Sequence, residues 1–166
     1  MSYKEVSVQT PLGEAKEYKM IDDPVLITIL RAGLAMHNGL LRTFDRCESA
    51  FVSAYREHTT PEEFNIHVEY LAAPNLDQRV WVISDPMLAS GSSMVNVYKA
   101  LLKFGKPKKI YVVVSIATPH AIELVEKELP QNTEIWTAAI DDELTAESYI
   151  VPGLGDAGDL AYGIKV

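Results

Sequence analysis

The stretch from Asp85 to Ser93 holds an acidic residue, a proline, a glycine and three serines, residue types that could bind a phosphorylated sugar. If a helix begins here, its free backbone N–H groups and its dipole favour an anion. Small side chains let an anion approach, serine hydroxyls add donors, and Asp85 could face ribose hydroxyls or a phosphate-bound cation. The same residues could instead only cap a helix and form a turn, so this stretch alone leaves both interpretations open.

Two arginines could supply a second anion site. Arg31 opens the segment Arg31-Ala32-Gly33 directly after an apolar run, and Arg56 closes the apolar run 50–54 as part of Tyr55-Arg56. An arginine at a strand end can clamp a phosphate with two hydrogen bonds, although one such arginine is more often part of a surface ion pair. Two of them beside a phosphate-binding loop favour a ligand that carries phosphate at two places.

These residues need a scaffold, and the pattern of apolar runs predicts one. Apolar runs predict strands at 25–30, 50–54, 80–84, 110–117 and 134–140, and the composition of 25–30 and 80–84 predicts that these two are buried. Helical spacing follows Gly33, Ser93 and Thr118, and strands that alternate with helices indicate a mostly parallel α/β sheet with helices on both faces. Ligands bind beyond the carboxyl ends of such strands, where Arg31, Arg56, Asp85 and the pair Asp141-Asp142 are predicted to lie.

The remaining segments predict less regular structure. Residues 64–71 alternate between apolar and polar, which predicts a half-exposed strand and the second arm of a protruding hairpin. Residues 5–9 predict a short extended piece before a turn at 11–13. Near the C-terminus, Gly153, Gly155 and Gly158 spell G-x-G-x-x-G, but no helical pattern follows and the chain ends eight residues later, so a dinucleotide site is not expected. The segment is interpreted as a loop whose backbone groups, with Asp156, could read the edge of a flat heterocycle, or as a turn-rich tail.

Composition excludes several classes of protein. The 166 residues are 48% hydrophobic and 23% charged, as expected for one globular domain, and no run is long enough to span a membrane. The net charge of −8 argues against a general nucleic-acid or anionic-membrane binder. The single cysteine, Cys47, allows no internal disulfide, which favours a cytoplasmic location. The four histidines are scattered without metal-ligand spacing, so each is interpreted as a surface or core residue.

The motifs together resemble the uracil phosphoribosyltransferases, a family of type I phosphoribosyltransferases. The matching segments are 29–34, Tyr55-Arg56, 85–93 and Ile140-Asp141 running into 149–159. The last segment is the most specific, because most other phosphoribosyltransferases lack it. The resemblance implies transfer of phosphoribosyl from 5-phosphoribosyl-1-pyrophosphate (PRPP) to uracil, which gives uridine monophosphate (UMP) and pyrophosphate.

The resemblance also implies site residues, position by position. PRPP would be bound by Arg31, Ala32, Gly33, Arg56, Asp85, Pro86, Met87, Leu88, Ala89, Ser90, Gly91, Ser92, Ser93 and Asp156. Uracil would be bound by Tyr149, Ile150, Gly155, Asp156 and Ala157. Asp156, Arg31 and Arg56 would act in catalysis, and Mg²⁺ would ride on the pyrophosphate without direct protein ligands. Cytosine is not expected to be a substrate.

The resemblance implies a homodimer or larger homo-oligomer and allows GTP as an effector. It further implies one phosphoribosyltransferase domain over residues 1–166 that lacks the largely helical N-terminal segment of the family. Two alternatives have the same fold: a nucleotide-sensing regulator that binds RNA, against which the charge of −8 counts, and a shortened form that binds phosphate without turnover.

Overall fold

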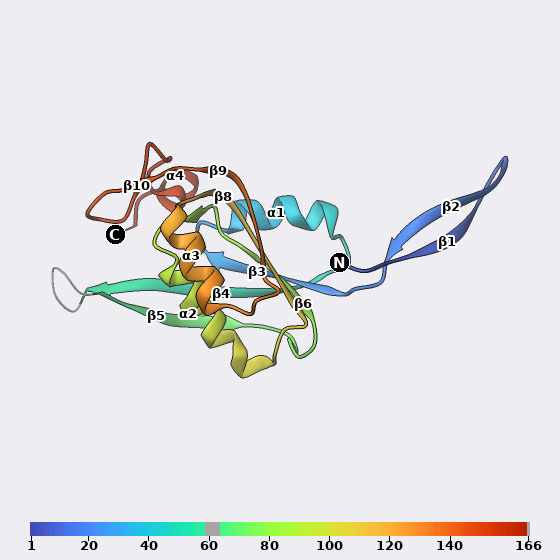
Figure 1. The fold of residues 1–166 in the computed structure, drawn as a ribbon, viewed down its shortest axis with the longest axis horizontal. Coiled ribbons are helices and arrows are strands. Elements are labelled where there is room, and N and C mark those ends of the chain that lie inside the picture. The colour runs from blue at the N-terminus through green and yellow to red at the C-terminus, as the bar shows by residue number, and fades with distance from the viewer. Residues whose placement is uncertain (59–63, 166) are drawn as a thin grey trace.

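A central sheet of seven strands organises the protein (Figure 1). The computed structural model describes residues 1–58 and 64–165, with the backbone alone for 54–58 and 64–68. The strand order is β5-β4-β3-β6-β8, and the short β7 and β9 both pair with β8. The strands are β3 (Pro24–Leu30), β4 (Glu48–His58), β5 (Phe64–Ala72), β6 (Val80–Ser84), β7 (Met87–Leu88), β8 (Lys109–Ala117) and β9 (Glu134–Ile140). All pairs are parallel except β4–β5, which confirms the predicted mostly parallel sheet.

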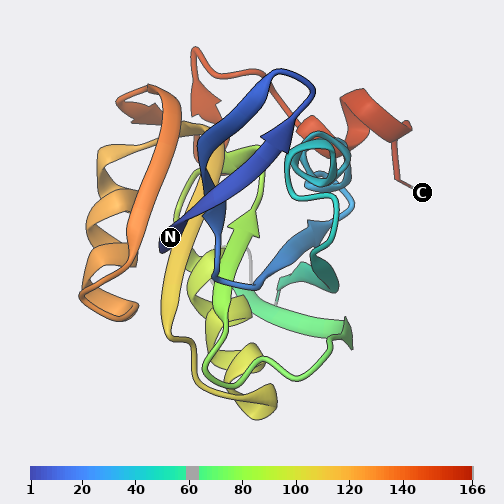
Figure 2. The same ribbon diagram turned by 90° about the vertical axis from the view of Figure 1, so that its right-hand side faces the viewer.

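The helices lie on both faces of this sheet. They are α1 (Leu34–Thr43), α2 (Ser92–Leu101), α3 (Pro119–Glu128) and α4 (Ala157–Tyr162), with a short 3-10 turn, η1 (Leu102–Phe104). The chain steps from β3 through α1 to β4 in one direction, and from β6 through α2 to β8 and through α3 to β9 in the other. Because such crossovers are right-handed, opposite directions place helices on opposite faces. Figure 2 shows α1 on one face and α2 and α3 on the other.

The burial of the central strands explains why their apolar runs could be recognised in the sequence. All five residues of β6 are buried, as are six of the seven in β3, because helices cover both faces of these strands. Trp81 in β6 is 0% exposed, and its indole N–H donates to the carbonyl of Leu76 at 2.9 Å. On α2, Met94, Val97 and Leu101 face this core, as their spacing predicted.

A two-stranded hairpin at the N-terminus projects from the body (Figure 1). It consists of β1 (Tyr3–Thr10) and β2 (Gly13–Met20), which pair antiparallel around the predicted turn. The sequence predicted the extended piece and the turn but missed β2. Half of the residues in this strand are charged and most are exposed, so it has no apolar alternation to mark it.

The second hairpin, β4–β5, corrects the predicted place of Arg56. The antiparallel pairing confirms β5 as the second arm, although the tip at 59–63 lies outside the described residues. Arg56 was expected at a strand end, but β4 continues to His58 because β5 pairs with it to that point. The last parallel pair between β3 and β4 is Leu30–Ser53, so the backbone of Arg56 still lies beyond the carboxyl edge of β3.

The sheet face that holds α1 is covered less completely than the other. Trp136 in β9 is 61% exposed, and it lines an apolar cavity of about 480 Å³ together with Leu40 of α1 and Phe44, the residue after that helix. Among the described residues, no helix has the length and apolar character needed to cross a membrane.

Candidate active site

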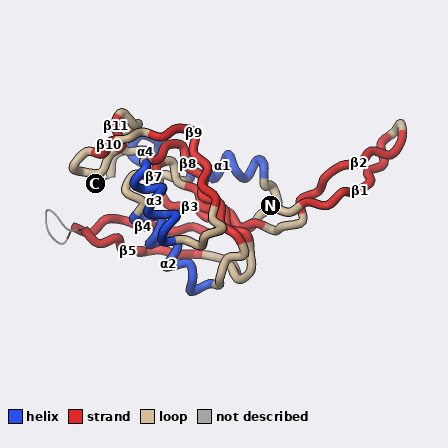
Figure 3. The backbone as a smooth tube through the Cα atoms, in the orientation of Figure 1, coloured by secondary structure: helices blue, strands red, loops and turns tan. Residues whose placement is uncertain are grey.

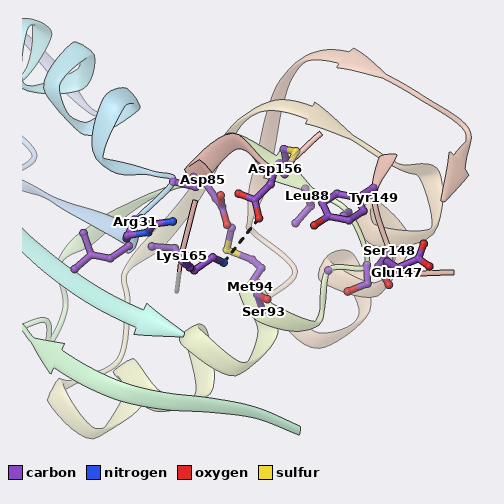
Figure 4. Close-up of a pocket in the computed structure, with 18 of the residues that line it drawn as sticks. Arg31, Asp85, Leu88, Ser93, Met94, Glu147, Ser148, Tyr149, Asp156 and Lys165 are labelled. Atoms are coloured by element: carbon purple, nitrogen blue, oxygen red, sulfur yellow. Dashed lines mark ion pairs between the residues drawn. The ribbon is translucent and has the colours of Figure 1, made fainter. Parts of the chain in front are cut away.

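A cavity of about 790 Å³ opens at the carboxyl ends of β3 and β6. These strands are neighbours, and the chain leaves them in opposite directions, so this is the point of the sheet where ligands usually bind. Its walls come from residues 29–32, from 85–94 after β6, and from the C-terminal segment. Figure 4 shows Arg31 and Lys165 on one side, Asp85 and Asp156 near the middle, and Glu147, Ser148 and Tyr149 on the other side.

The β3–α1 loop presents Arg31 and Ala32 to the cavity. The peptide bond between Leu30 and Arg31 is cis. The Arg31 guanidinium contacts Asp159 at 2.7 Å (Nη2 to Oδ1) and the carbonyl of Gly163 at 3.2 Å (Nη1). Gly33 does not line the cavity but is buried behind it, where an added Cβ would lie 2.7 Å from the carbonyl oxygen of Ile29 and 2.9 Å from that of Ser84. Glycine is therefore needed for β3 and β6 to end side by side.

Asp85 follows β6 at the floor of the cavity. Burial raises the pKa of its carboxyl group to about 7, and a hydrogen bond from the backbone of Met87 opposes this only in part. The loop is fastened to β8, because the N–H of Asp85 donates to Val113 at 3.2 Å and the carbonyl of Pro86 accepts from Ser115 at 3.0 Å and Ile116 at 3.1 Å. The loop is therefore preorganised, with Pro86 buried beneath it.

The N-terminus of α2 completes this wall without a side-chain cap. Gly91 is its N-cap residue in a left-handed conformation (φ 79°), and the Ser90 hydroxyl accepts only a long bond from the N–H of Ser92, at 3.4 Å. Helix α1 likewise begins at a glycine, Gly33, without a side-chain cap. By contrast, Thr118 caps α3 and Asp156 caps α4. Three helices thus begin at or beside the cavity, and two of them, α1 and α2, lack a capping side chain, whereas Asp156 caps the third, α4.

The C-terminal segment forms the opposite wall. Strands β10 (Glu143–Leu144) and β11 (Ile150–Val151) pair antiparallel close to α4 (Figure 3). The predicted carboxylate Asp141 lies at the base, where its Oδ2 accepts from the N–H of Gly153 at 3.0 Å. This bond fixes the turn that follows β11, which explains the role of Asp141 without direct contact to the cavity.

A short helix corrects the prediction that no helix follows Gly158. Helix α4 covers Ala157–Tyr162, and Asp156 Oδ1 accepts from the N–H of Asp159 at 2.8 Å. The signal was present as an aspartate three residues before a second aspartate, a typical N-cap arrangement, but an apolar stripe was absent. Gly155, just before the helix, has φ 75°, and space is open around its Cβ position.

The structure brings most predicted site residues to the cavity. Those that line it are Arg31, Ala32, Asp85, Met87, Leu88, Ala89, Ser90, Gly91, Ser93, Tyr149 and Asp156. Six predicted residues lie behind or beside the lining: Gly33, Pro86, Ser92, Ile150, Gly155 and Ala157. The side chain of Arg56 falls outside the described part of the structure, and only its backbone position in β4 is given.

Sequence reasoning missed several lining residues. Met94, Glu147, Ser148, Gly158 and Lys165 also line the cavity. Lys165 approaches Asp156, with 3.8 Å between Nζ and Oδ2. The sequence marked Met94 only as a core residue of α2 and Gly158 only as part of the glycine pattern near the C-terminus. No local motif marks Glu147, Ser148 and Lys165, because only the folding of the C-terminal segment brings them to the cavity.

The histidines play no part in this cavity among the described side chains. His37 is 3% exposed, its Nδ1 lies 2.8 Å from the hydroxyl of Thr28, and burial lowers its pKa. It is therefore a core residue, as interpreted from the sequence, and His120 is exposed. The side chains of His58 and His67 lie outside the described part. Within that part, no group of three or more His, Cys, Asp or Glu residues is arranged to hold a metal ion.

Comparison with known sequences points to one family. The sequence profile of the family described as uracil phosphoribosyltransferase matches residues 1–164. A protein named uracil phosphoribosyltransferase from Porphyromonas gingivalis is 55% identical over 160 residues, which are 96% of this chain and 74% of that protein. Another of that name, from Methanothermobacter thermautotrophicus, is 36% identical over 165 residues, which are 98% of this chain and 74% of that protein.

Solved structures share the fold. The AQ2163 protein from Aquifex aeolicus has a TM-score of 0.86 and 31% identity, with 100% of this chain and 78% of that chain covered. A hypoxanthine phosphoribosyltransferase from Staphylococcus aureus has a TM-score of 0.55 at 11% identity, with 75% of this chain and 65% of that chain covered, and it shows the fold alone. With a type I phosphoribosyltransferase fold and a family match over nearly its whole length, this chain belongs to the uracil phosphoribosyltransferase family.

Proposed function

We propose that the cavity between β3, β6 and α4 is where this enzyme transfers phosphoribosyl from PRPP to uracil. The reaction is that of the family, and it yields UMP and pyrophosphate in pyrimidine salvage. The observation that carries the assignment is that α2 begins at the cavity and α1 begins directly behind its lining residue Ala32, both without side-chain caps. Uncapped helix N-termini favour anions, and PRPP carries phosphate at two places.

The two phosphate groups are assigned to different walls. We assign the 5-phosphate and ribose to residues 85–93, with Asp85 facing the ribose hydroxyls, because small residues line the cavity there and α2 begins without a side-chain cap. We assign the pyrophosphate to Arg31, the neighbouring backbone of Ala32 and Gly33, and Arg56. When the bond from C1′ to pyrophosphate breaks, negative charge grows on the leaving group, and an arginine that binds it more strongly as charge grows lowers the barrier.

Uracil is assigned to the C-terminal wall. The backbone groups of Ile150, Gly155 and Ala157 would read its polar edge, and Tyr149 would line the site beside it. The open space around Gly155 supports this approach to the backbone. We assign to Asp156 the removal of the N1 proton as the bond from N1 to C1′ forms, since its carboxylate lines the cavity between the two proposed substrate sites.

A divalent metal is general in this family, and we propose Mg²⁺. Mg²⁺ dehydrates reluctantly and keeps several waters, and it is commonly held through substrate phosphates. The ion would therefore be carried by the pyrophosphate of PRPP, and Asp85, which lines the cavity, would face it without binding it directly. Bound with PRPP, the ion would add positive charge beside the leaving pyrophosphate.

Replacing Arg31 tests the assignment of the pyrophosphate. We expect Arg31→Ala to weaken PRPP binding by about tenfold or more, because charge-assisted hydrogen bonds contribute about 1.5–3 kcal/mol each. Arg42→Ala, at the exposed far end of α1, is the matched control and should bind PRPP as the original protein does. Titration calorimetry measures both. Unchanged PRPP affinity in Arg31→Ala would overturn the assignment.

Selectivity for the base tests the uracil wall. Cytosine presents an amino donor where uracil presents a carbonyl oxygen, so backbone N–H donors aimed at that oxygen would be left unpaired, and sites of this kind reject the mismatched substrate by about 10⁴-fold or more. We therefore expect product from uracil and none above background from cytosine. Equal turnover of the two bases would contradict backbone recognition.

The remaining proposals follow from the family resemblance. We propose that residues 1–166 act as one phosphoribosyltransferase domain, that the protein forms a homodimer or larger homo-oligomer, and that GTP acts as an effector. Analytical ultracentrifugation measures the oligomeric state. Initial rates with and without GTP measure the effect of the nucleotide.

A further inference from the structure

Helix α4 is connected to the β3–α1 loop through Arg31. The Arg31 guanidinium donates from Nη2 to Oδ1 of Asp159 at 2.7 Å and from Nη1 to the carbonyl of Gly163 at 3.2 Å. Both acceptors belong to α4 or to the residue that ends it. A guanidinium has five N–H donors in a fixed plane. These two bonds therefore fix its orientation and leave the other donors for a ligand.

Asp159 is itself held in place. Its backbone N–H donates to Oδ1 of Asp156 at 2.8 Å, so the first turn of α4 fixes the two aspartates relative to each other. Between them, Gly158 packs close to the β3–α1 loop, since an added Cβ would lie 3.7 Å from the Cβ of Ala32. The Asp159 side chain is 25% exposed and that of Arg31 is 39% exposed, so their ion pair is partly shielded from water. Such a pair keeps more of its strength than one on an open surface.

We propose that Asp159 is a positioning residue that orients the Arg31 guanidinium toward the pyrophosphate of PRPP. The proposal rests on the function assigned above, in which Arg31 binds that group. Through Asp156, the same contacts join the proposed uracil wall to the pyrophosphate wall. An arginine whose side chain is already ordered loses less conformational entropy when the ligand binds, so Asp159 lowers the concentration of PRPP that the enzyme needs.

A competing role for Asp159 predicts the opposite effect on PRPP binding. If Asp159 competed with pyrophosphate for Arg31, its removal would strengthen PRPP binding. Because the guanidinium can keep both bonds to α4 and still donate to phosphate, positioning is the role that its geometry favours.

Three variants of Asp159 separate these roles. We expect Asp159→Ala to raise the KM for PRPP about tenfold, from the loss of a charge-assisted hydrogen bond, and to change the KM for uracil less than about twofold. Asp159→Asn keeps the shape and one acceptor oxygen, so its KM for PRPP should lie between those of the original protein and Asp159→Ala. Asp159→Glu keeps the charge, so its KM for PRPP should also be lower than that of Asp159→Ala. Glu128→Ala, which breaks the exposed ion pair with Lys99 (2.9 Å), is the matched control and should change neither KM.

A double-mutant cycle with Arg31→Ala decides between positioning and a structural role. In the Arg31→Ala background, Asp159→Ala should change the KM for PRPP less than about twofold. Full additivity of the two substitutions, or a lower KM in Asp159→Ala, would overturn the role of Asp159 and leave that of Arg31 intact. Normal PRPP kinetics in Arg31→Ala alone would overturn the assignment of Arg31 instead. Thermal unfolding of Asp159→Asn and Asp159→Ala is measured alongside, and the near-isosteric asparagine variant keeps the test valid if the alanine variant unfolds.

Discussion

Asp85 is half-buried and lines the cavity, and its surroundings raise the pKa of its carboxyl group. Its pKa is about 7 in the folded protein, against an ordinary value of 3.8. Between these values the folded protein retains a proton that the unfolded chain has lost. The unfolded state therefore binds fewer protons, and the contribution of Asp85 to the free energy of unfolding decreases as pH rises from about 4 to about 7.

This predicts a pH-dependent effect of Asp85→Asn in the ligand-free protein. The asparagine variant cannot deprotonate, so its stability relative to the original protein should be greater at pH 8 than at pH 5. Urea unfolding of both proteins at these two pH values measures the difference. An equal stability difference at pH 5 and pH 8 would contradict a raised pKa at Asp85.

Asp156 offers a second test at the level of one residue. Asp156→Asn should lower kcat by about 100-fold or more, the usual range for losing a general base, with little change in the KM for uracil. Asparagine is about as good an N-cap residue as aspartate, so α4 should remain folded. Circular dichroism and a thermal scan check this point. If turnover stays unchanged, Asp156 does not accept the proton.

Single residues could be predicted where chemistry and local pattern coincide. Arg31 and Asp85 follow apolar runs that had to be buried strands, and both residues line the cavity. Lys165 could not be predicted, because it reaches the cavity only after the C-terminal segment has folded over it. Arg56 was placed by the same reasoning as Arg31, but the pairing with β5 extends its strand further.

At the scale of elements, burial determined what the sequence could predict. Strand β6 begins and ends at the predicted residues, 80–84, because it is a fully buried run bounded by Arg79 and Asp85. Strand β9 also has its predicted bounds, 134–140, although most of its residues are exposed. Strand β2 and helix α4 were missed because neither has an apolar face. Strand β2 is held by hydrogen bonds to β1, its neighbour in the sequence. Helix α4 is held by a hydrogen bond from Arg31, which is far from it in the sequence.

Two glycines near α1 provide a matched pair of variants. An added Cβ at Gly33 would overlap backbone oxygens of Ile29 and Ser84 at 2.7 and 2.9 Å, whereas nothing lies within 4 Å of the Cβ position of Gly39. Gly33→Ala should therefore destabilise the protein by about 1–3 kcal/mol, the usual cost of overpacking. Gly39→Ala, on the exposed face of α1, should stabilise it by about 1 kcal/mol through helix propensity. Urea unfolding measures both, and equal effects of the two variants would show that β3 and β6 do not approach as described.

At the scale of the whole molecule, the two faces of the sheet differ in their cover. Trp81 is fully buried between helices and sheet, while Trp136 is 61% exposed on the α1 side. Acrylamide should therefore quench the emission of Trp136 far more than that of Trp81, and Trp136→Phe should leave a protected emission at shorter wavelength. Equal protection of both tryptophans in the native protein would show that the α1 face is covered in solution.

The central claim, that one cavity brings PRPP and uracil together, is tested most directly by product formation. The protein is mixed with radiolabelled uracil, PRPP and Mg²⁺, and UMP and pyrophosphate are quantified, with cytosine in a parallel reaction. We predict one UMP and one pyrophosphate for each uracil consumed. A folded protein that binds PRPP and uracil but forms no UMP would contradict the claim and leave a binding protein on the same fold.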